Sequence, residues 1–228
     1  MNKKKIIIFS IIFLFILVVG ITGVYFFFFK KSQPVFDYNN EAFVFNINKQ
    51  GEFDRDRLNR LEEKRVLALD LYRKEINDNW TWITIGNYYE YARDYDKAVF
   101  AYKRVMELNS NDTMALSNLA HIYDRQFSNY EEARNYYDKL ITAVPYLYEN
   151  YIDLANMYEY KMQKPTKAAE TYLVGLQNLP GHPNLLIGLI RYYVRQNDLI
   201  EARKYAEILF KQDPNNETYL RDFGKLLE

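Results

Sequence analysis

The chain has 228 residues, of which 49% are hydrophobic and 26% charged, so it can build one ordinary globular core and does not have the composition of a disordered protein. Cysteine is absent and there are two histidines, which excludes thiol nucleophiles, disulfide bonds and zinc-finger spacings. The net charge is zero, but five lysines flank the first apolar segment and leave 25 basic against 30 acidic residues from position 32 onward. Because no basic cluster stands there to neutralise phosphates, no nucleic-acid partner is expected.

Residues 6–29 form a continuous apolar segment without a charged side chain. As a helix this segment is about 36 Å long, which spans a hydrocarbon core of about 30 Å. A cleaved signal peptide is the alternative, but its apolar region is about 7–15 residues long and is followed by small residues at a cleavage site. Here the apolar segment continues to Phe29. Residues 1–31 are therefore expected to be a transmembrane anchor with flanking lysines.

The lysines beside this segment give a prediction of its orientation. Three of them, at positions 3–5, precede it, and Lys30 and Lys31 follow it. Flanks rich in Lys and Arg tend to stay in the cytoplasm. The small excess favours a cytoplasmic N-terminus and an extracytoplasmic C-terminal domain, in the periplasm or envelope. The excess is so small that a single added charge could reverse the predicted orientation.

Two segments connect the anchor to the rest of the chain. Residues 32–53 show no helical period and are expected to be a tether, with one short strand around residues 42–47. From residue 54 to residue 78 the apolar side chains fall on one helical face. This segment is expected to be a packing or capping helix, or half of a degenerate repeat.

An internal repeat follows, and it sets the architecture. Alanines recur at nearly constant intervals, at Ala98, Ala133, Ala168 and Ala202. Tyrosines recur in the same phase, at Tyr89, Tyr123, Tyr158 and Tyr193. Each tyrosine is preceded by large apolar residues and usually a small one, as in "WITIGNYY" from Trp82. A period of this length indicates repeated units that stack on one another, with small residues where backbones approach and rings in the spaces between units.

The pattern resembles the tetratricopeptide repeat, whose signature W-x2-L-G-x2-Y…A-x3-F…P is matched by "WITIGNYY…AVFAY". The resemblance implies an all-α solenoid of four helix-turn-helix repeats, residues 79–112, 113–147, 148–182 and 183–216, followed by a capping helix over residues 217–228. Repeats two and three are each one residue longer than the others, and the turn between their helices is expected to hold the extra residue. Tyr89 and Tyr102 are expected to be packing residues.

The resemblance also implies a ligand groove on the inner, concave face, which is lined by the first helix of each repeat. Eleven residues are expected there: Trp80, Asn87, Tyr91, Asn118, His121, Glu149, Asp153, Asn156, Tyr160, Arg191 and Arg195. Asn87 and Asn118 match the asparagines of the members that clamp the C-terminal carboxylate of chaperones. Ile83, Glu149 and Asp153 stand where that clamp needs basic side chains, so this activity is not expected here.

The groove is expected to be acidic in repeats one to three and basic toward repeat four. Its acidic members are Glu90, Asp124, Glu149, Asp153 and Glu159, and its basic members are Arg125, Arg191 and Arg195. A protein or peptide segment with basic and apolar residues at one end and acidic residues at the other would complement it.

No motif for catalysis, phosphate binding or metal binding occurs in the chain. We therefore expect no enzyme and no cofactor, but a membrane-anchored scaffold or adaptor that binds a protein partner. The alternative is a structural protein that self-assembles through its repeats into a membrane-associated oligomer. An accessory subunit of an envelope enzyme complex is a third possibility, which differs from the first only in the partner.

Overall fold

The computed structural model describes residues 53–228, which consist of helices and turns without a strand. The predicted anchor and most of the predicted tether lie outside the described residues. No helix within residues 53–228 is both long and apolar enough to cross a membrane. The helices are α3 (Arg55–Lys74), α4 (Asn79–Tyr91), α5 (Tyr95–Leu108), α6 (Thr113–Arg125), α7 (Tyr130–Ala143), α8 (Tyr148–Asn156), η2 (Met157–Lys161), α9 (Pro165–Asn178), α10 (Pro183–Arg195), α11 (Leu199–Gln212), α12 (Glu217–Phe223) and η3 (Gly224–Leu226).

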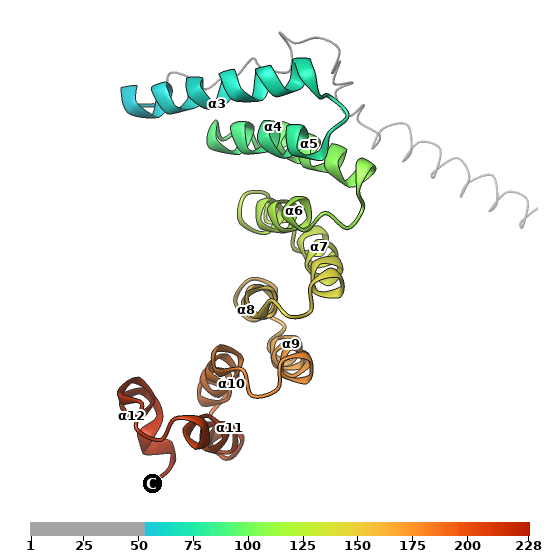
Figure 1. Cartoon of the computed structure of the whole chain (residues 1–228). Coiled ribbons are helices and arrows are strands. Elements are labelled where there is room, and N and C mark those ends of the chain that lie inside the picture. The colour runs from blue at the N-terminus through green and yellow to red at the C-terminus, as the bar shows by residue number, and fades with distance from the viewer. Residues whose placement is uncertain (1–52) are drawn as a thin grey trace, which may run out of the picture. The chain divides into compact units, whose positions relative to one another are not determined.

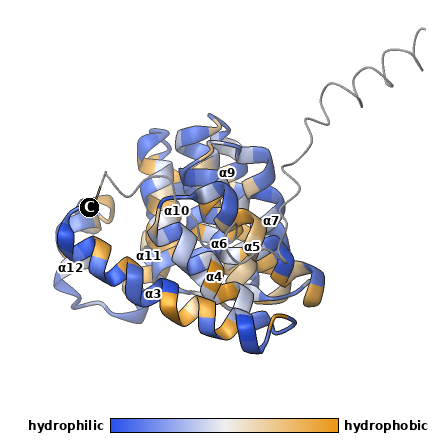
Figure 2. Ribbon diagram, turned by 90° about the horizontal axis from the view of Figure 1, so that it is seen from above, coloured by the Kyte–Doolittle hydropathy of each residue, from blue (hydrophilic) through white to orange (hydrophobic). Residues whose placement is uncertain are grey.

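Helices α4 to α11 pack as four consecutive pairs, and each pair packs on the next (Figure 1). The first helices of the pairs, such as α6, α8 and α10, lie on one side of the stack, and the second helices α7, α9 and α11 lie on the other. In Figure 2 hydrophobic and hydrophilic residues alternate along the helices, as expected for helices that bury one face. The described residues therefore form an all-α solenoid, as the repeat predicts.

Local sequence signals explain where these helices begin. The side chains of Asp78, Asp94 and Asp112 each accept a hydrogen bond from a backbone N–H in the first turn of the helix that follows. Helices α9 and α10 instead begin with Pro165 and Pro183, whose missing N–H would have no partner at that position anyway.

Small residues let the paired helices approach, as expected. The four repeating alanines are completely buried, and Tyr89 and Tyr102 are core residues, which confirms their predicted packing role. At Gly86 an added Cβ would lie 2.4 Å from the ring of Tyr102, a distance that no side chain tolerates. The ring of a second helix thus rests directly on the backbone of the first.

The turn inside each pair contains one residue in the left-handed region, with φ between 51° and 58°: Arg93, Ser128, Gln163 and Asn197. The extra residue of repeat two lies in this turn, as predicted. In repeat three the prediction was wrong, because the extra residue is absorbed by the π-helical turn η2 that continues α8. A π-turn accommodates one more residue inside the helix, so the turn before α9 keeps its usual length.

Helices α3 and α12 cover the two ends of the stack. Helix α3 packs on α4, where the rings of Tyr72 and Trp82 meet edge to face at 6.4 Å. Helix α12 is short, and Phe223 is its buried anchor. Leu220, an apolar residue of this predicted capping helix, is exposed and does not pack on repeat four. The packed face instead begins at Tyr219 and continues through Phe223 at i+4, and this phase turns Leu220 outward.

Candidate functional site

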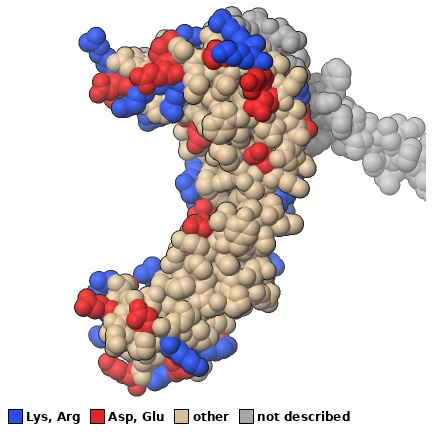
Figure 3. Space-filling model, in the orientation of Figure 1, with Lys and Arg blue, Asp and Glu red and all other residues tan. Residues whose placement is uncertain are grey.

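The residues expected in the groove all lie on the first helices α4, α6, α8 with η2, and α10. In Figure 3, which has the orientation of Figure 1, this side of the stack is hollowed between α3 and α12. Lys, Arg, Asp and Glu side chains gather over α3 and over the helices at the C-terminal end, and the surface between them that faces the viewer is mostly uncharged. We call the side formed by the first helices the inner face. Side chains bridge successive helices all along it.

At the N-terminal end, α3 covers Tyr91. The guanidinium of Arg57 donates to the Tyr91 carbonyl oxygen at 2.7 Å and lies 4.8 Å from the centre of its ring. Arg60 Nε donates to the Tyr91 hydroxyl at 2.9 Å, and the Lys64 ammonium lies 5.2 Å from the ring centre. Tyr91 was expected to stand open in the groove, but cations of α3 cover its ring because α3 packs along α4.

Two of the three predicted groove asparagines, Asn87 and Asn118, hold the hydroxyl of a buried tyrosine. Tyr102, on α5, donates to Asn87 Oδ1 at 2.7 Å and lies 3.0 Å from Glu90 Oε2, and its hydroxyl also interacts with Asn118. Burial and then the Glu90 charge raise the pKa of Tyr102, so the phenol stays neutral. Repeat three has a weaker counterpart, in which the Tyr172 hydroxyl lies 3.4 Å from Asn156 Oδ1.

An ionic cluster connects α6 with α8 and η2 at the middle of the inner face. His121 Nε2 lies 3.2 Å from Asp153 Oδ2, and Arg125 reaches the same oxygen at 3.8 Å. Lys161 Nζ donates to Asp124 Oδ2 at 2.6 Å, and this carboxylate is only 6% exposed. Lys161 was not predicted to belong to the inner face, because it lies in the π-turn, which leaves no mark in the hydrophobic period.

A second ion pair connects η2 with α10. Arg195 makes two parallel hydrogen bonds to the Glu159 carboxylate, at 2.8 and 2.6 Å, and Glu159 is 9% exposed. The bond to Glu159 raises the pKa of Arg195. The guanidinium also lies 5.4 Å from the centre of the Tyr160 ring. This geometry is bidentate and close to the core, which is the arrangement of a strong charge-assisted pair.

At the C-terminal end, Arg191 pairs with the capping helix. It lies 3.2 Å from Asp222 Oδ2 and 5.8 Å from the centre of the Phe223 ring. Hydrogen bonds from Arg221 and Arg191 hold the pKa of Asp222 below its usual value. The same helical phase of α12 that exposes Leu220 brings the Asp222 carboxylate to Arg191.

The acidic character expected of the groove is therefore largely neutralised within the chain. Asp124, Asp153 and Glu159 all have basic partners on neighbouring first helices. Among the described residues we find no partner for the Glu149 carboxylate, which is exposed. Position alone predicted that these carboxylates lie on the inner face, and it could not show that the next repeat supplies their counter-ions.

Apolar side chains remain open on this face. The first helices carry four exposed large hydrophobic residues: Trp80 and Met114 near the beginning of α4 and α6, Tyr160 in η2, and Val194 near the end of α10. Trp80 is 56% exposed and Tyr160 is 53% exposed. Exposed apolar side chains are unfavourable in water, so these four residues are the parts of the face best suited to bind another molecule. Residues 53–228 contain no group of three or more His, Asp or Glu side chains arranged to hold a metal ion.

Comparisons with known proteins agree with this architecture. Residues 83–148 match the family model of the tetratricopeptide repeat. The crystal structure of YrrB, a tetratricopeptide repeat protein with an unusual peptide-binding site, is 16% identical and superposes with a TM-score of 0.51 over 70% of this chain and 81% of that one. The fold is that of a tetratricopeptide repeat solenoid.

Two further neighbours with this fold are PilF of Pseudomonas aeruginosa and MamA, from residue 41 onward, of Desulfovibrio magneticus. PilF is 16% identical, with a TM-score of 0.54 over 72% of this chain and 74% of that one. MamA is 17% identical, with a TM-score of 0.51 over 69% and 97%. The general transcriptional corepressor trfA of Dictyostelium discoideum is 27% identical over 142 residues, which are 61% of this chain but only 10% of that protein.

Proposed function

We propose that the protein is a non-catalytic adaptor, anchored in a membrane by residues 6–29, whose tetratricopeptide solenoid binds a protein partner on its inner face. The observation that carries the proposal is the set of four exposed apolar side chains on the first helices, Trp80, Met114, Tyr160 and Val194. The peptide-binding site named for YrrB, which shares the fold, supports the same use of such a solenoid.

The partner is expected to supply apolar anchors first and charges second. Because most inner-face carboxylates are already paired, an apolar segment that reaches Trp80 and Tyr160 would gain most of its affinity from burial of these rings. Glu149 has no counter-ion in the described part of the chain and would favour a basic residue nearby. We therefore still expect a partner with basic and apolar residues, and we expect its apolar side chains to contribute most of the affinity.

The test compares two double variants. Trp80→Ala with Tyr160→Ala removes the inner anchors, and Val66→Ala with Leu67→Ala removes two exposed apolar residues of α3 as a control. The tagged full-length variants are used to capture proteins from membrane extracts, which are quantified by mass spectrometry. A true partner is lost with the first variant and retained with the second. Equal capture by both variants would show that the inner face is not the binding surface.

Self-assembly is the second candidate function, because the same exposed apolar residues could be covered by another copy of the chain. Light scattering on the purified full-length protein separates the two functions. A monomer leaves the face free for a partner, and an oligomer that dissociates in the Trp80→Ala, Tyr160→Ala variant supports self-assembly. If the protein is an accessory subunit of an envelope enzyme complex, it should be a monomer in light scattering, and enzyme subunits should be among the captured proteins.

The proposed topology rests on the lysines around residues 6–29, which favour a cytoplasmic N-terminus and an extracytoplasmic solenoid. A reporter that is active only outside the cytoplasm, fused after Glu228, is expected to be active. Activity of a cytoplasmic reporter at the same position would place the solenoid in the cytoplasm.

A further inference from the structure

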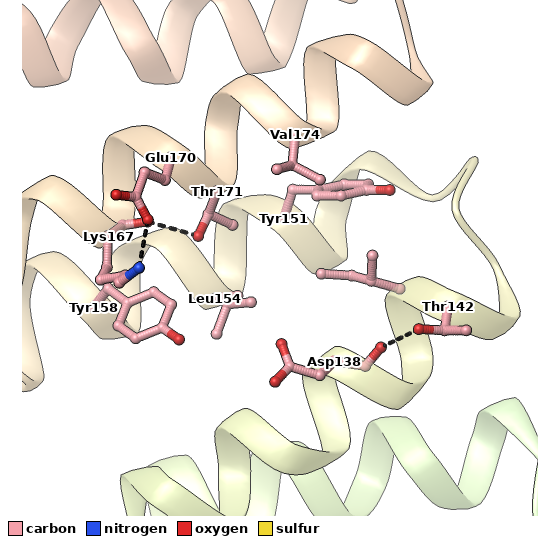
Figure 4. A pocket seen from close by; sticks show the side chains of 10 residues that line it. Asp138, Thr142, Tyr151, Leu154, Tyr158, Lys167, Glu170, Thr171 and Val174 are labelled. Carbon is pink, nitrogen blue, oxygen red and sulfur yellow. Dashed lines mark hydrogen bonds and ion pairs between the residues drawn. The ribbon is translucent and has the colours of Figure 1, made fainter.

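The other side of the stack contains a hollow of about 340 Å³ between the second helices α7 and α9 (Figure 4). Ile141, Leu154 and Val174 give it an apolar lining, and the ring of Tyr158 stands at one end. Asp138 and Glu170 contribute carboxylates to its border. The Lys167 ammonium, also at the border, is bonded to Glu170 at 2.6 Å.

The repeat shows what is missing from this hollow. The position that Thr171 holds in repeat three is occupied by Tyr136 in repeat two and by Tyr205 in repeat four. Tyr136 stacks on Tyr123 with ring centres 5.6 Å apart and an interplanar angle of 10°. Tyr205 stacks on Tyr193 in the same way, at 5.7 Å and 3°. Each stack joins the second helix of a pair to the first.

In repeat three only one half of this stack is present. Tyr158 occupies the position of Tyr123 and Tyr193, but Thr171 has no ring, and its hydroxyl donates to the carbonyl oxygen of Lys167 at 2.7 Å. Both Tyr158 and Thr171 line the hollow. The absent phenol therefore accounts for a cavity beside a tyrosine ring that has no stacking neighbour from α9.

Repeat two shows that a tyrosine ring fits such a space. Tyr136 packs against the cluster that contains Leu116, with Met106 beside it. The counterparts of Met106 and Leu116 one repeat later are Ile141 and Tyr151, and both line the hollow of repeat three. The same set of positions thus surrounds an internal tyrosine in one repeat and an open space in the next.

We propose that this hollow binds the side chain of a tyrosine from a partner protein, stacked on the face of Tyr158 in the place that Tyr136 occupies one repeat earlier. The apolar lining would cover the inserted ring, and one of the two carboxylates at the border, Asp138 or Glu170, would accept its hydroxyl hydrogen. This site is separate from the inner face and does not depend on the function proposed for that face.

The probe is 4-methylphenol, which is the tyrosine side chain as a free molecule. It is titrated into full-length protein with isotope-labelled Ile, Leu, Val and Thr methyl groups and followed by NMR. We expect saturable shifts at Ile141, Leu154 and Val174 with a Kd on the order of millimolar. 4-Methylcyclohexanol, of similar size but without a flat ring, should bind about 3- to 10-fold more weakly.

Two variants of one residue provide the control. Thr171→Tyr supplies the ring from within and should abolish the shifts while it leaves the helical circular dichroism unchanged. Thr171→Val keeps the space open and should retain binding. The proposal is overturned if the natural protein shows no saturable shift, if Thr171→Tyr binds 4-methylphenol as well as Thr171→Val does, or if 4-methylcyclohexanol binds equally well.

Discussion

At the scale of single residues, the polar side chains of the inner face have two roles. The position of a residue in the repeat does not show which role it has. Some of its polar side chains fasten one first helix to the next, as Glu159 and Arg195 do, and others remain exposed, as Glu149 does. The distinction depends on what lies one repeat away. A residue that is already paired and partly buried is mainly a structural element, whereas an exposed ring such as Trp80 is available to a ligand.

The ion pair between Glu159 and Arg195 gives the first prediction. Arg195→Met keeps most of the length of the side chain but leaves a buried carboxylate without its counter-ion, so we expect the free energy of unfolding to fall by about 1–3 kcal/mol. Arg125→Met is the matched control, because Arg125 is exposed and 3.8 Å from Asp153, and its loss should change stability by less than about 0.5 kcal/mol. Urea unfolding of both variants measures the difference, and equal stabilities would show that the Glu159 pair contributes nothing.

Loss of the hydroxyl group should have different effects on stability at two tyrosines that hold the same position in neighbouring repeats. Tyr102→Phe removes an oxygen that interacts with Asn87 and Glu90, and we expect a loss of about 1–2 kcal/mol. The hydroxyl of Tyr137, at the same position of repeat two, is buried and has no hydrogen-bond partner among the described residues. Tyr137→Phe should therefore leave stability unchanged or raise it by up to about 1 kcal/mol. Equal destabilisation in thermal melts of the two variants would contradict this assignment.

At the scale of elements, the turns inside the helical pairs share one backbone conformation, although different residues adopt it. Ser128 adopts φ 51° although it has a Cβ, and such a conformation costs about 1–2 kcal/mol for most L-residues. Ser128→Gly should raise the free energy of unfolding by about 0.5–1 kcal/mol, after the greater chain entropy of glycine is subtracted. Asn197→Gly should gain less, since asparagine tolerates this region. Calorimetry that finds the larger gain at Asn197 would argue against strain in the turns.

Helix positions could be predicted from the sequence much better than contacts between helices. The recurrence of Ala98 and its counterparts indicated the pairs, and capping residues such as Asp112 mark where helices begin. The bond between Lys161 and Asp124 could not be foreseen, because it depends on a π-turn that shifts the end of the helix. The hollow at Thr171 could have been suspected from the aligned repeats, since a tyrosine stands at that position in repeats two and four.

At the scale of the whole solenoid, residues 53–228, stability depends on many buried phenols. Burial raises the pKa of Tyr88 and of Tyr172 to about 12, against an ordinary value of 10.0, and the two residues lie in different repeats. Because the folded pKa is the higher one, the stability that they contribute is present below pH 10 and is lost as the pH rises toward about 12. We expect loss of helical circular dichroism in this window together with the ultraviolet absorbance of phenolate. Gradual ionisation without loss of helix would show that these rings are accessible.

The central claim is that the inner face binds a protein partner, and site-specific photo-crosslinking in intact cells tests it most directly. A photoreactive phenylalanine analogue is placed in the full-length chain at Trp80 or Tyr160 on the inner face, and at Ile208, an exposed residue of the second helix α11, as a control. We expect a discrete adduct with a second protein from the two inner positions and none from Ile208. Adducts from all three positions alike, or from Ile208 alone, would contradict the claim.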